Sequence, residues 1–248
     1  MAWMSWAGFR NNLTYAAPEL ERLGIPALIH VATGHIGQSG LLWTQELDER
    51  IGSWKQTNLP MPQGQADASM PTHTADRWQL ADRIRGICKR LPHEGRVAYL
   101  NRLRQEQLSV DEGWQRELYA FLSWDEVRAL AHRGFSIGSH TVSHPILTTL
   151  SRDDLLLELG ESKSRIEREL SQPCPWIAYP NGGPTDVSPG VVQAVAEAGY
   201  TIAFTLMGSI NPKSLRPLEI DRVCVPGELS VDEFHASLNG LSAWLRTL

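Results

Sequence analysis

Short apolar segments that are typical of β-strands alternate along this chain with segments of helical periodicity. The strand-like segments are residues 27–31, 135–137, 176–178 and 200–206. The apolar residues between them recur at helical spacing, as in the run of Leu155, Leu159, Ile166 and Leu170. This order favours parallel strands with helices packed outside. The loops after the strands then meet at one rim, where the chemistry of α/β barrels is located.

Two serines predict where helices begin. Glu126 follows Ser123 by three residues, which indicates a capping box that opens a helix over 124–133, with Gly134 as its end. Ser151 repeats the signal before the next helical run. Because these signals are local, they define the outer helices without knowledge of the sheet.

Residues 44–122 break the alternation. A segment rich in proline and glycine comes first, followed by two amphipathic patterns near 78–91 and 97–103. We interpret this stretch as a helical insertion within a single domain that spans 1–248. Its tryptophans are Trp43, Trp54, Trp78 and Trp114. Core packing is the favoured interpretation of these side chains, and a lid that stacks on sugars is the alternative.

Composition and charge restrict the partners of the chain. The formal net charge is −5, which argues against nucleic acid as a main partner. The three cysteines are far apart and form neither a disulfide framework nor a CxxC metal pair. No segment approaches the ~20 apolar residues of a membrane span, and the first residues do not resemble a signal peptide. We therefore expect a cytoplasmic protein, and the sequence indicates no particular oligomeric state.

The loop at 138–145 carries two histidines just after a predicted strand. His140 and His144 are four residues apart, so both imidazoles can face one cleft. Imidazole is the commonest protein ligand of zinc and related metals. A catalytic site of this kind also needs a third protein ligand, usually a carboxylate, and an open position for water. Asp111 and Asp186 are carboxylates of the chain, but nothing in their spacing places them at this loop.

Six blocks of residues carry a resemblance to a known family. They are residues 8–12, 24–27, 33–37, 138–145, 178–182 and 197–200. In these blocks the chain resembles the polysaccharide deacetylases, the NodB-homology domain of carbohydrate esterase family 4, over about residues 8–240. The resemblance implies a distorted (β/α)7 TIM-like barrel. It also implies a divalent metal, usually zinc, and hydrolysis of the N-acetyl amide of an amino sugar.

Particular roles follow from the resemblance. It implies that His140 and His144 bind the metal, and that the backbone N–H of Asn181 faces the oxyanion of the reaction. The neighbours of Asn181 in the same loop, Tyr179, Pro180 and Gly182, are then expected to bind substrate.

The first motif departs from the family pattern. The family has Phe-Asp-Asp-Gly where this chain has residues 5–8, Ser-Trp-Ala-Gly. Trp6 therefore occupies the position of the general base, and Ala7 that of the third metal ligand. Neither side chain can bind a metal or accept a proton. Either a genuine loss of both aspartates or a disrupted reading frame before Gly8 accounts for the change.

The late motifs of the family, an Asp-Trp element and a Leu-x-His element, have no clear match in this chain. His35 follows the second strand on the expected rim and is a weak candidate for the missing general acid. A histidine hydrogen-bonded within its own turn is an equal alternative. His235 falls in a late helical segment and is expected at the surface.

Three functions remain open at this point. The first is an amino-sugar N-deacetylase by descent with impaired activity, in which zinc is weakly bound or absent. The second is a non-catalytic carbohydrate-binding pseudoenzyme that uses the same cleft. The third is a deacylase of a small non-sugar amide.

Overall fold

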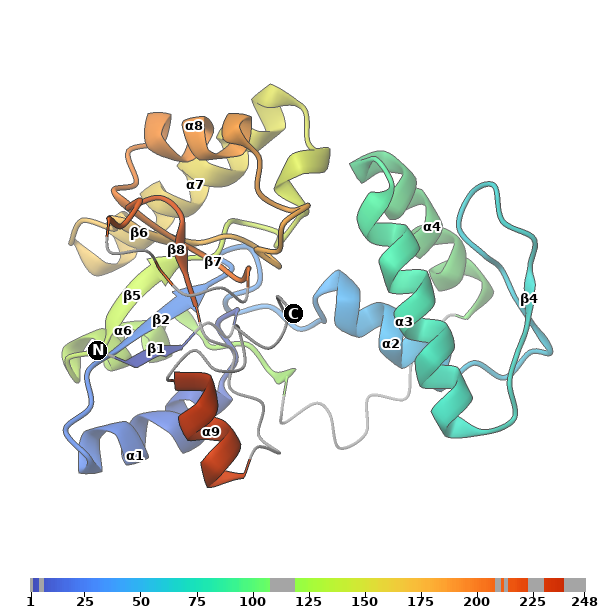
Figure 1. The fold of residues 1–248 in the computed structure, drawn as a ribbon, viewed down its shortest axis with the longest axis horizontal. Coiled ribbons are helices and arrows are strands. Elements are labelled where there is room, and N and C mark those ends of the chain that lie inside the picture. Colours follow the sequence, from blue (N-terminus) through green and yellow to red (C-terminus); the bar gives the residue numbers. More distant parts are fainter. Residues whose placement is uncertain are drawn as a thin grey trace.

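The core of the fold is a parallel sheet of six strands (Figure 1). The computed structural model describes residues 2–4, 7–107, 119–207, 211, 214–222 and 230–238. In sheet order the strands are β1 (Ala2–Met4), β2 (Ala27–Val31), β5 (Ser136–Ser139), β6 (Trp176–Ala178), β7 (Ile202–Thr205) and β8 (Ile220–Asp221). Every pairing is parallel.

The strands follow one another in chain order, without the reversal of a doubly wound sheet. This is the winding of an α/β barrel, and it confirms the predicted fold class. It also brings the C-terminal ends of neighbouring strands to one edge. At that edge the N–H of His140, just after β5, donates to the carbonyl of Val31 at the end of β2 (2.9 Å).

Helices cover the outside of the sheet. They are α1 (Ala17–Arg22), α6 (Trp124–His132), α7 (Arg152–Leu170) and α8 (Pro189–Glu197), and α9 (Val231–Leu238) is the last described helix of the chain. Short helical turns precede α1 and α7, namely η1 (Asn12–Ala16) and η2 (Leu147–Thr149). Successive residues of a strand point to opposite faces. Ile29 of β2 accordingly packs in the cluster shared with the outer helices, whereas Leu28 packs with Phe204 in the interior cluster.

The expected helix starts are confirmed. The Ser123 hydroxyl accepts from the N–H of Glu126 (3.2 Å), and the Glu126 carboxylate accepts from the N–H of Ser123 (2.8 Å). Ser151 caps α7 in the same way by accepting from the N–H of Asp154 (3.1 Å). Gly134 follows α6 with φ 91°, a conformation that favours glycine.

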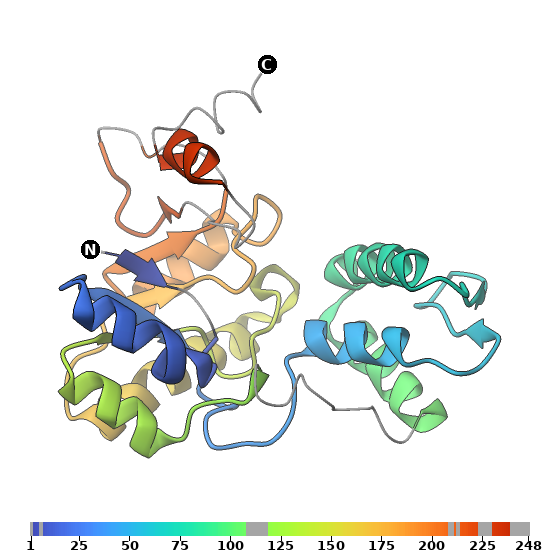
Figure 2. The same ribbon diagram turned by 90° about the horizontal axis from the view of Figure 1, so that it is seen from below.

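The segment between β2 and β5 forms a lobe beside the sheet, as Figure 2 shows. Its elements are α2 (Trp43–Gly52), β3 (Asn58–Leu59), β4 (Ala68–Ser69), α3 (Thr74–Arg90) and α4 (His93–Glu106). The lobe has its own apolar cluster, in which Trp54 is almost fully buried. Trp43 packs at the edge of this cluster and Trp78 is partly exposed, while Trp114 lies outside the described residues. Core packing therefore accounts for Trp54, the most deeply buried of the three tryptophans that lie within the described residues.

The structure also describes two of the three cysteines and the length and apolar character of the helices. Cys88 and Cys174 are buried free thiols, and Cys224 is not among the described residues. Within the described ranges, no helix combines the length and apolar character needed to cross a membrane.

Candidate functional site

The two histidines of the 138–145 loop meet at the C-terminal edge of β5. Their ring centroids are 4.7 Å apart and their planes are nearly perpendicular, at 81°. Both residues are buried. The structure thus places the two imidazoles at the rim, within the distance over which two rings can face one small group.

A backbone hydrogen bond fixes the ring of His140. Its Nδ1 lies 2.7 Å from the carbonyl oxygen of Ala178, at the end of β6. Because a carbonyl only accepts, Nδ1 carries the proton, and in the neutral ring Nε2 keeps its lone pair. This arrangement is typical of a metal-ligating histidine, whose second nitrogen is held by a backbone carbonyl or a carboxylate.

Both imidazoles are held in the neutral form. Burial, and then the neighbouring His144, lowers the pKa of His140 well below its ordinary value. Burial lowers the pKa of His144 to about 4. The positive charges of the His35, Lys89 and Arg222 side chains contribute to this lowering of the pKa. Neutral imidazole is the form that binds metals and accepts protons. The pair is therefore suited to either task at neutral pH.

The loop that carries the histidines has an unusual backbone. Thr141 and His144 adopt positive φ angles of 68° and 57°. Each such residue costs about 1–3 kcal/mol unless its surroundings hold it in place. Here the Thr141 hydroxyl accepts from the N–H of His144 (3.2 Å). The N–H groups of Thr33 and Gly34 also donate to the carbonyls of Thr141 (3.0 Å) and Val142 (2.9 Å).

His35 lies beside this loop. Its ring stacks on Phe121 with 4.8 Å between centroids. Burial lowers the pKa of His35, while a hydrogen bond to the backbone of Ser143 and the charge of Glu158 oppose that change. The structure therefore brings His35 close to the pair, and its bond to Ser143 is also what a structural histidine would make.

The loop after β6 begins directly after Ala178, whose carbonyl contacts the ring of His140. Asn181 has φ 59°, and its backbone N–H donates to no acceptor in the described part of the chain. The N–H of Gly182 donates to Pro180 (2.7 Å), and the carboxylate of Asp186 accepts from the N–H of Gly183 (3.0 Å). A free N–H in a braced turn is what an oxyanion contact requires.

Tyr179, which the resemblance places in the site, and Asp186, a carboxylate with no predicted place there, are both buried. Tyr179 is completely buried in the main core and donates its hydroxyl to the carbonyl of Leu218 (2.9 Å), so its side chain supports the loop from behind. Asp186 is buried as the brace of Gly183 and belongs to no group of metal-binding side chains. Asp111 lies outside the described residues.

The position at which the resemblance expects the third metal ligand is apolar. Ala7 is buried in a small cluster with Phe9, Leu42 and Phe121, and its carbonyl accepts from Ala32, just after β2 (3.3 Å). Trp6 lies outside the described residues. Within the described part of the chain, no three histidine, cysteine, aspartate or glutamate side chains are grouped to hold a metal. The histidine pair fits a metal on one side, but the described residues do not complete a three-ligand site.

Two residues near His140 and His144 were not predicted from the sequence. His30 of β2 is fully buried, with its ring centroid 6.3 Å from that of His140. Its position on a predicted strand that ends at the rim could have indicated that it lies near the site. Glu158 of α7 accepts from the N–H groups of Val142 (2.8 Å) and Ser143 (3.0 Å). No sequence signal pairs Glu158 with a loop fifteen residues earlier.

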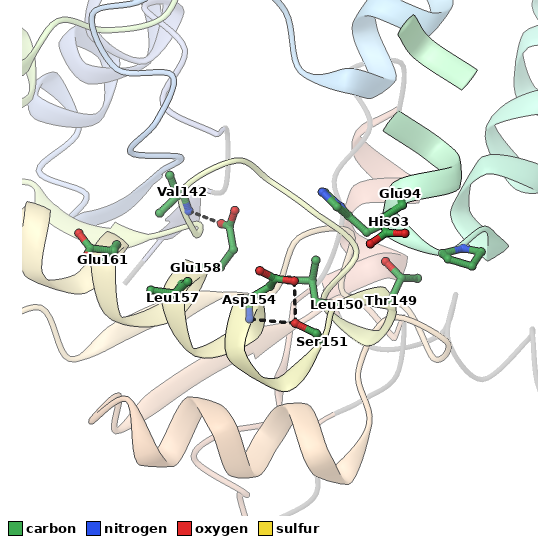
Figure 3. A pocket seen from close by; sticks show the side chains of 11 residues that line it. His93, Glu94, Val142, Thr149, Leu150, Ser151, Asp154, Leu157, Glu158 and Glu161 are labelled. Atoms are coloured by element: carbon green, nitrogen blue, oxygen red, sulfur yellow. Dashed lines mark hydrogen bonds between the residues drawn. The ribbon is translucent and has the colours of Figure 1, made fainter. Parts of the chain in front are cut away.

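A groove of about 740 Å³ runs beside the histidine loop (Figure 3). Pro92, His93 and Glu94, at the start of α4, form one side. Val142 and the first turns of α7, including Asp154 and Glu158, form the other. The insertion lobe therefore helps to shape the surface next to the site.

Comparisons with known proteins identify the family. Residues 7–203 match the sequence model of the family described as Polysaccharide deacetylase, and the chain belongs to that family. The resemblance stated from the sequence is thus confirmed. No protein of curated function matches the chain significantly.

Solved structures share the fold at low identity. A deacetylase from Streptococcus pyogenes, PplD in complex with acetate, is 17% identical with a TM-score of 0.57, covering 95% of this chain and 69% of its own. The de-N-acetylase from Aggregatibacter actinomycetemcomitans is 13% identical with a TM-score of 0.53 (95% and 73% covered). IcaB from Ammonifex degensii is 16% identical with a TM-score of 0.52 (97% and 70% covered). At these identities the likeness concerns the fold.

Proposed function

We propose that this chain is an amino-sugar N-deacetylase by descent, in which hydrolysis of the N-acetyl amide is lost or severely impaired. The observation that carries the proposal is a contrast within one rim. The rings of His140 and His144 meet at the rim beside the strand that precedes Asn181, whereas Ala7, at the position where the resemblance expects a carboxylate, has a buried methyl group.

The loss of chemistry follows from the donors that remain. Two neutral imidazoles supply lone pairs, and the N–H of Asn181 supplies one donor for an oxyanion. A water attacking an amide also needs a base to take its proton, and general-base assistance contributes ~100- to 10,000-fold to rate. His35 is the nearest candidate for a proton-transfer role. It is held by Ser143 and Phe121, so we expect at most slow turnover.

Acetate release tests this proposal. The purified chain is incubated with N-acetylglucosamine oligomers and added zinc or cobalt, and free acetate is measured over hours. We expect release near the background without protein. Rapid turnover by the wild-type chain would overturn the proposal of impaired activity, and rapid turnover of small amides alone would favour the deacylase alternative.

A second candidate is a carbohydrate-binding protein without catalysis. The groove beside the histidine loop favours it, because its volume lies within the ~300–1,000 Å³ of ordinary ligand pockets and its walls remain formed without the first motif. Calorimetry with N-acetylglucosamine oligomers tests it. Saturable binding without acetate release would support this function, and no binding at millimolar oligomer would exclude it.

A further inference from the structure

One carboxylate on α7 holds the loop that carries the histidine pair. Glu158 accepts three hydrogen bonds, from the N–H of Val142 (2.8 Å), the N–H of Ser143 (3.0 Å) and the hydroxyl of Ser143 (2.5 Å). Figure 3 shows the Glu158 side chain reaching from the helix toward Val142. The two N–H groups lie between His140 and His144, so the contact is made at the centre of the loop.

The backbone of this loop needs such support. Thr141 is β-branched and has φ 68°, and His144 has φ 57°, both in the left-handed region that side chains disfavour. These two residues flank the pair of N–H groups that Glu158 binds. If those N–H groups lost their acceptor, the loop would relax toward ordinary φ values and the two rings would turn apart. Hydrogen bonds to charged groups are stronger than those between neutral groups, and their contribution is comparable to the strain.

Other contacts hold other groups of the same loop. Before the loop, the hydroxyl of Ser139 bonds to that of Ser162 on α7 (2.7 Å) and accepts from the N–H of Thr141 (3.1 Å). On the outer side, Thr33 and Gly34 bind the carbonyls of Thr141 and Val142. Glu158 is the acceptor for the N–H groups of Val142 and Ser143, and the Thr141 hydroxyl accepts from the next N–H, that of His144 (3.2 Å).

We infer that Glu158 is a positioning residue for the histidine pair: it sets the loop backbone so that the imidazoles of His140 and His144 converge. This inference concerns the site of the proposed function and gains its importance from it. A glutamate that merely tied a surface loop to a helix would contribute to stability alone. Replacing a positioning residue must also change the orientation of the two rings while the protein stays folded.

Nuclear magnetic resonance of the imidazole nitrogens provides the test. Long-range ¹H–¹⁵N spectra are recorded on metal-free protein with a chelator present, so the result does not depend on turnover. In the wild type we expect His140 as the Nδ1–H form, as its bond to Ala178 requires. In Glu158→Ala the signals of both rings should shift or broaden, while circular dichroism stays native.

Two matched variants of Glu158 separate the effect of side-chain length from the effect of its negative charge. Glu158→Gln keeps the length of the side chain, so its oxygen can accept from the two N–H groups and its amide can donate to the Ser143 hydroxyl; we expect ring signals close to wild type. Glu158→Asp keeps the charge but is one methylene shorter, and we expect the shifts of the alanine variant. Glu161→Ala, on the same helix and lining the same groove, should leave the rings unchanged.

Zinc affinity gives a second readout. Residues that orient ligands contribute about 10- to 100-fold to metal affinity. We therefore expect the zinc dissociation constant to rise about 10-fold in Glu158→Asp and less than twofold in Glu161→Ala. Unchanged ring signals in a folded Glu158→Ala or Glu158→Asp protein would overturn the inference. If the alanine variant does not fold, the aspartate variant decides. Fast turnover by the wild type would contradict the proposed function without altering these spectra.

Discussion

Two buried imidazoles and one buried methyl group define the site at the scale of single residues. Each imidazole has a nitrogen lone pair available in its neutral form, and His140 is oriented by the Ala178 carbonyl as a metal ligand would be. Ala7 brings no donor to the third position. The chemistry expected of the chain therefore depends on how tightly two imidazole ligands alone can bind a metal.

Zinc binding should be weak. Each lost ligand removes several kcal/mol of favourable coordination, so the histidine pair should hold zinc far less tightly than a three-ligand site. Calorimetry should show weak binding that disappears in His140→Ala, because one imidazole remains. Tight stoichiometric zinc in the purified protein would mean that another side chain of the chain serves as the third ligand.

Acid should destabilise the metal-free protein through the same residues. Burial lowers the pKa of His144 to about 4, whereas the unfolded imidazole titrates near ~6.5. Between these values the unfolded chain binds more protons, so the free energy of unfolding rises with pH across this window. The stabilising contribution is full above the unfolded pKa and is lost as the pH falls toward 4. A shift of this size corresponds to about 3 kcal/mol.

Urea denaturation at pH 7 and pH 4.5, with a chelator present, measures the effect. His144→Asn is the matched variant, because asparagine tolerates the left-handed backbone of this position. We expect the loss of stability between the two pH values to be smaller in the variant than in the wild type. An equal loss in both proteins would show that His144 titrates normally in the fold.

At the scale of elements, the insertion lobe contains a buried ionic group that links α2 to α4. The carboxylate of Glu46 accepts from Arg50 on its own helix (2.8 Å) and from Arg104 on α4 (2.7 Å). Burial alone would raise the pKa of Glu46, but the hydrogen bonds from Arg104 and Arg50 outweigh it and hold the pKa below its ordinary value. Glu46 therefore remains charged within the lobe.

Removing this carboxylate should destabilise the lobe. Glu46→Ala leaves the buried Arg50 without its carboxylate, with the Gln107 carbonyl (2.6 Å) as its remaining acceptor among the described residues, and breaking a buried ion pair costs about 3 kcal/mol in comparable cases. Thermal or urea unfolding should show the loss. Glu94→Ala, at an exposed position of α4, is the control and should change stability by less than about 0.5 kcal/mol. Equal effects of the two substitutions would argue against the role of Glu46.

The elements that the sequence predicts best are those with local signals. Capping by Ser123 and Ser151 depends on residues three positions away, so both helix starts were visible without the fold. The paired strands β3 and β4 and the last strand β8 have two residues each, too few for a periodic pattern. Their existence depends on partners elsewhere in the chain.

The candidate site also combines features that local sequence signals predict with features that depend on distant parts of the chain. The spacing of His140 and His144, together with their place after a strand, sufficed to predict that their rings meet. The support from Glu158 and the approach of His30 could not be predicted, since both depend on how β2, β5 and α7 pack. The burial of Tyr179 behind its loop likewise follows from the core that surrounds it.

At the scale of the whole molecule, the deacetylase fold is formed although the first motif of its family is missing. Strands wind in chain order, outer helices cover them, and the loops after β5 and β6 meet at one rim. The three related structures share this fold at 13–17% identity. The scaffold therefore does not depend on the aspartates. Our central claim is that restoring both aspartates is enough to recover measurable hydrolysis at this rim, although the late motifs of the family have no clear match.

Restoring the first motif tests that claim most directly. Acetate release from N-acetylglucosamine oligomers with added zinc is measured for Trp6→Asp, Ala7→Asp and the double variant. We predict that Ala7→Asp binds zinc more tightly with little turnover, and that Trp6→Asp neither binds zinc more tightly nor releases acetate. The double variant should exceed the turnover of both by ~100-fold or more, because base and metal ligand act as a unit. A folded double variant that binds zinc tightly and releases no acetate would contradict the claim.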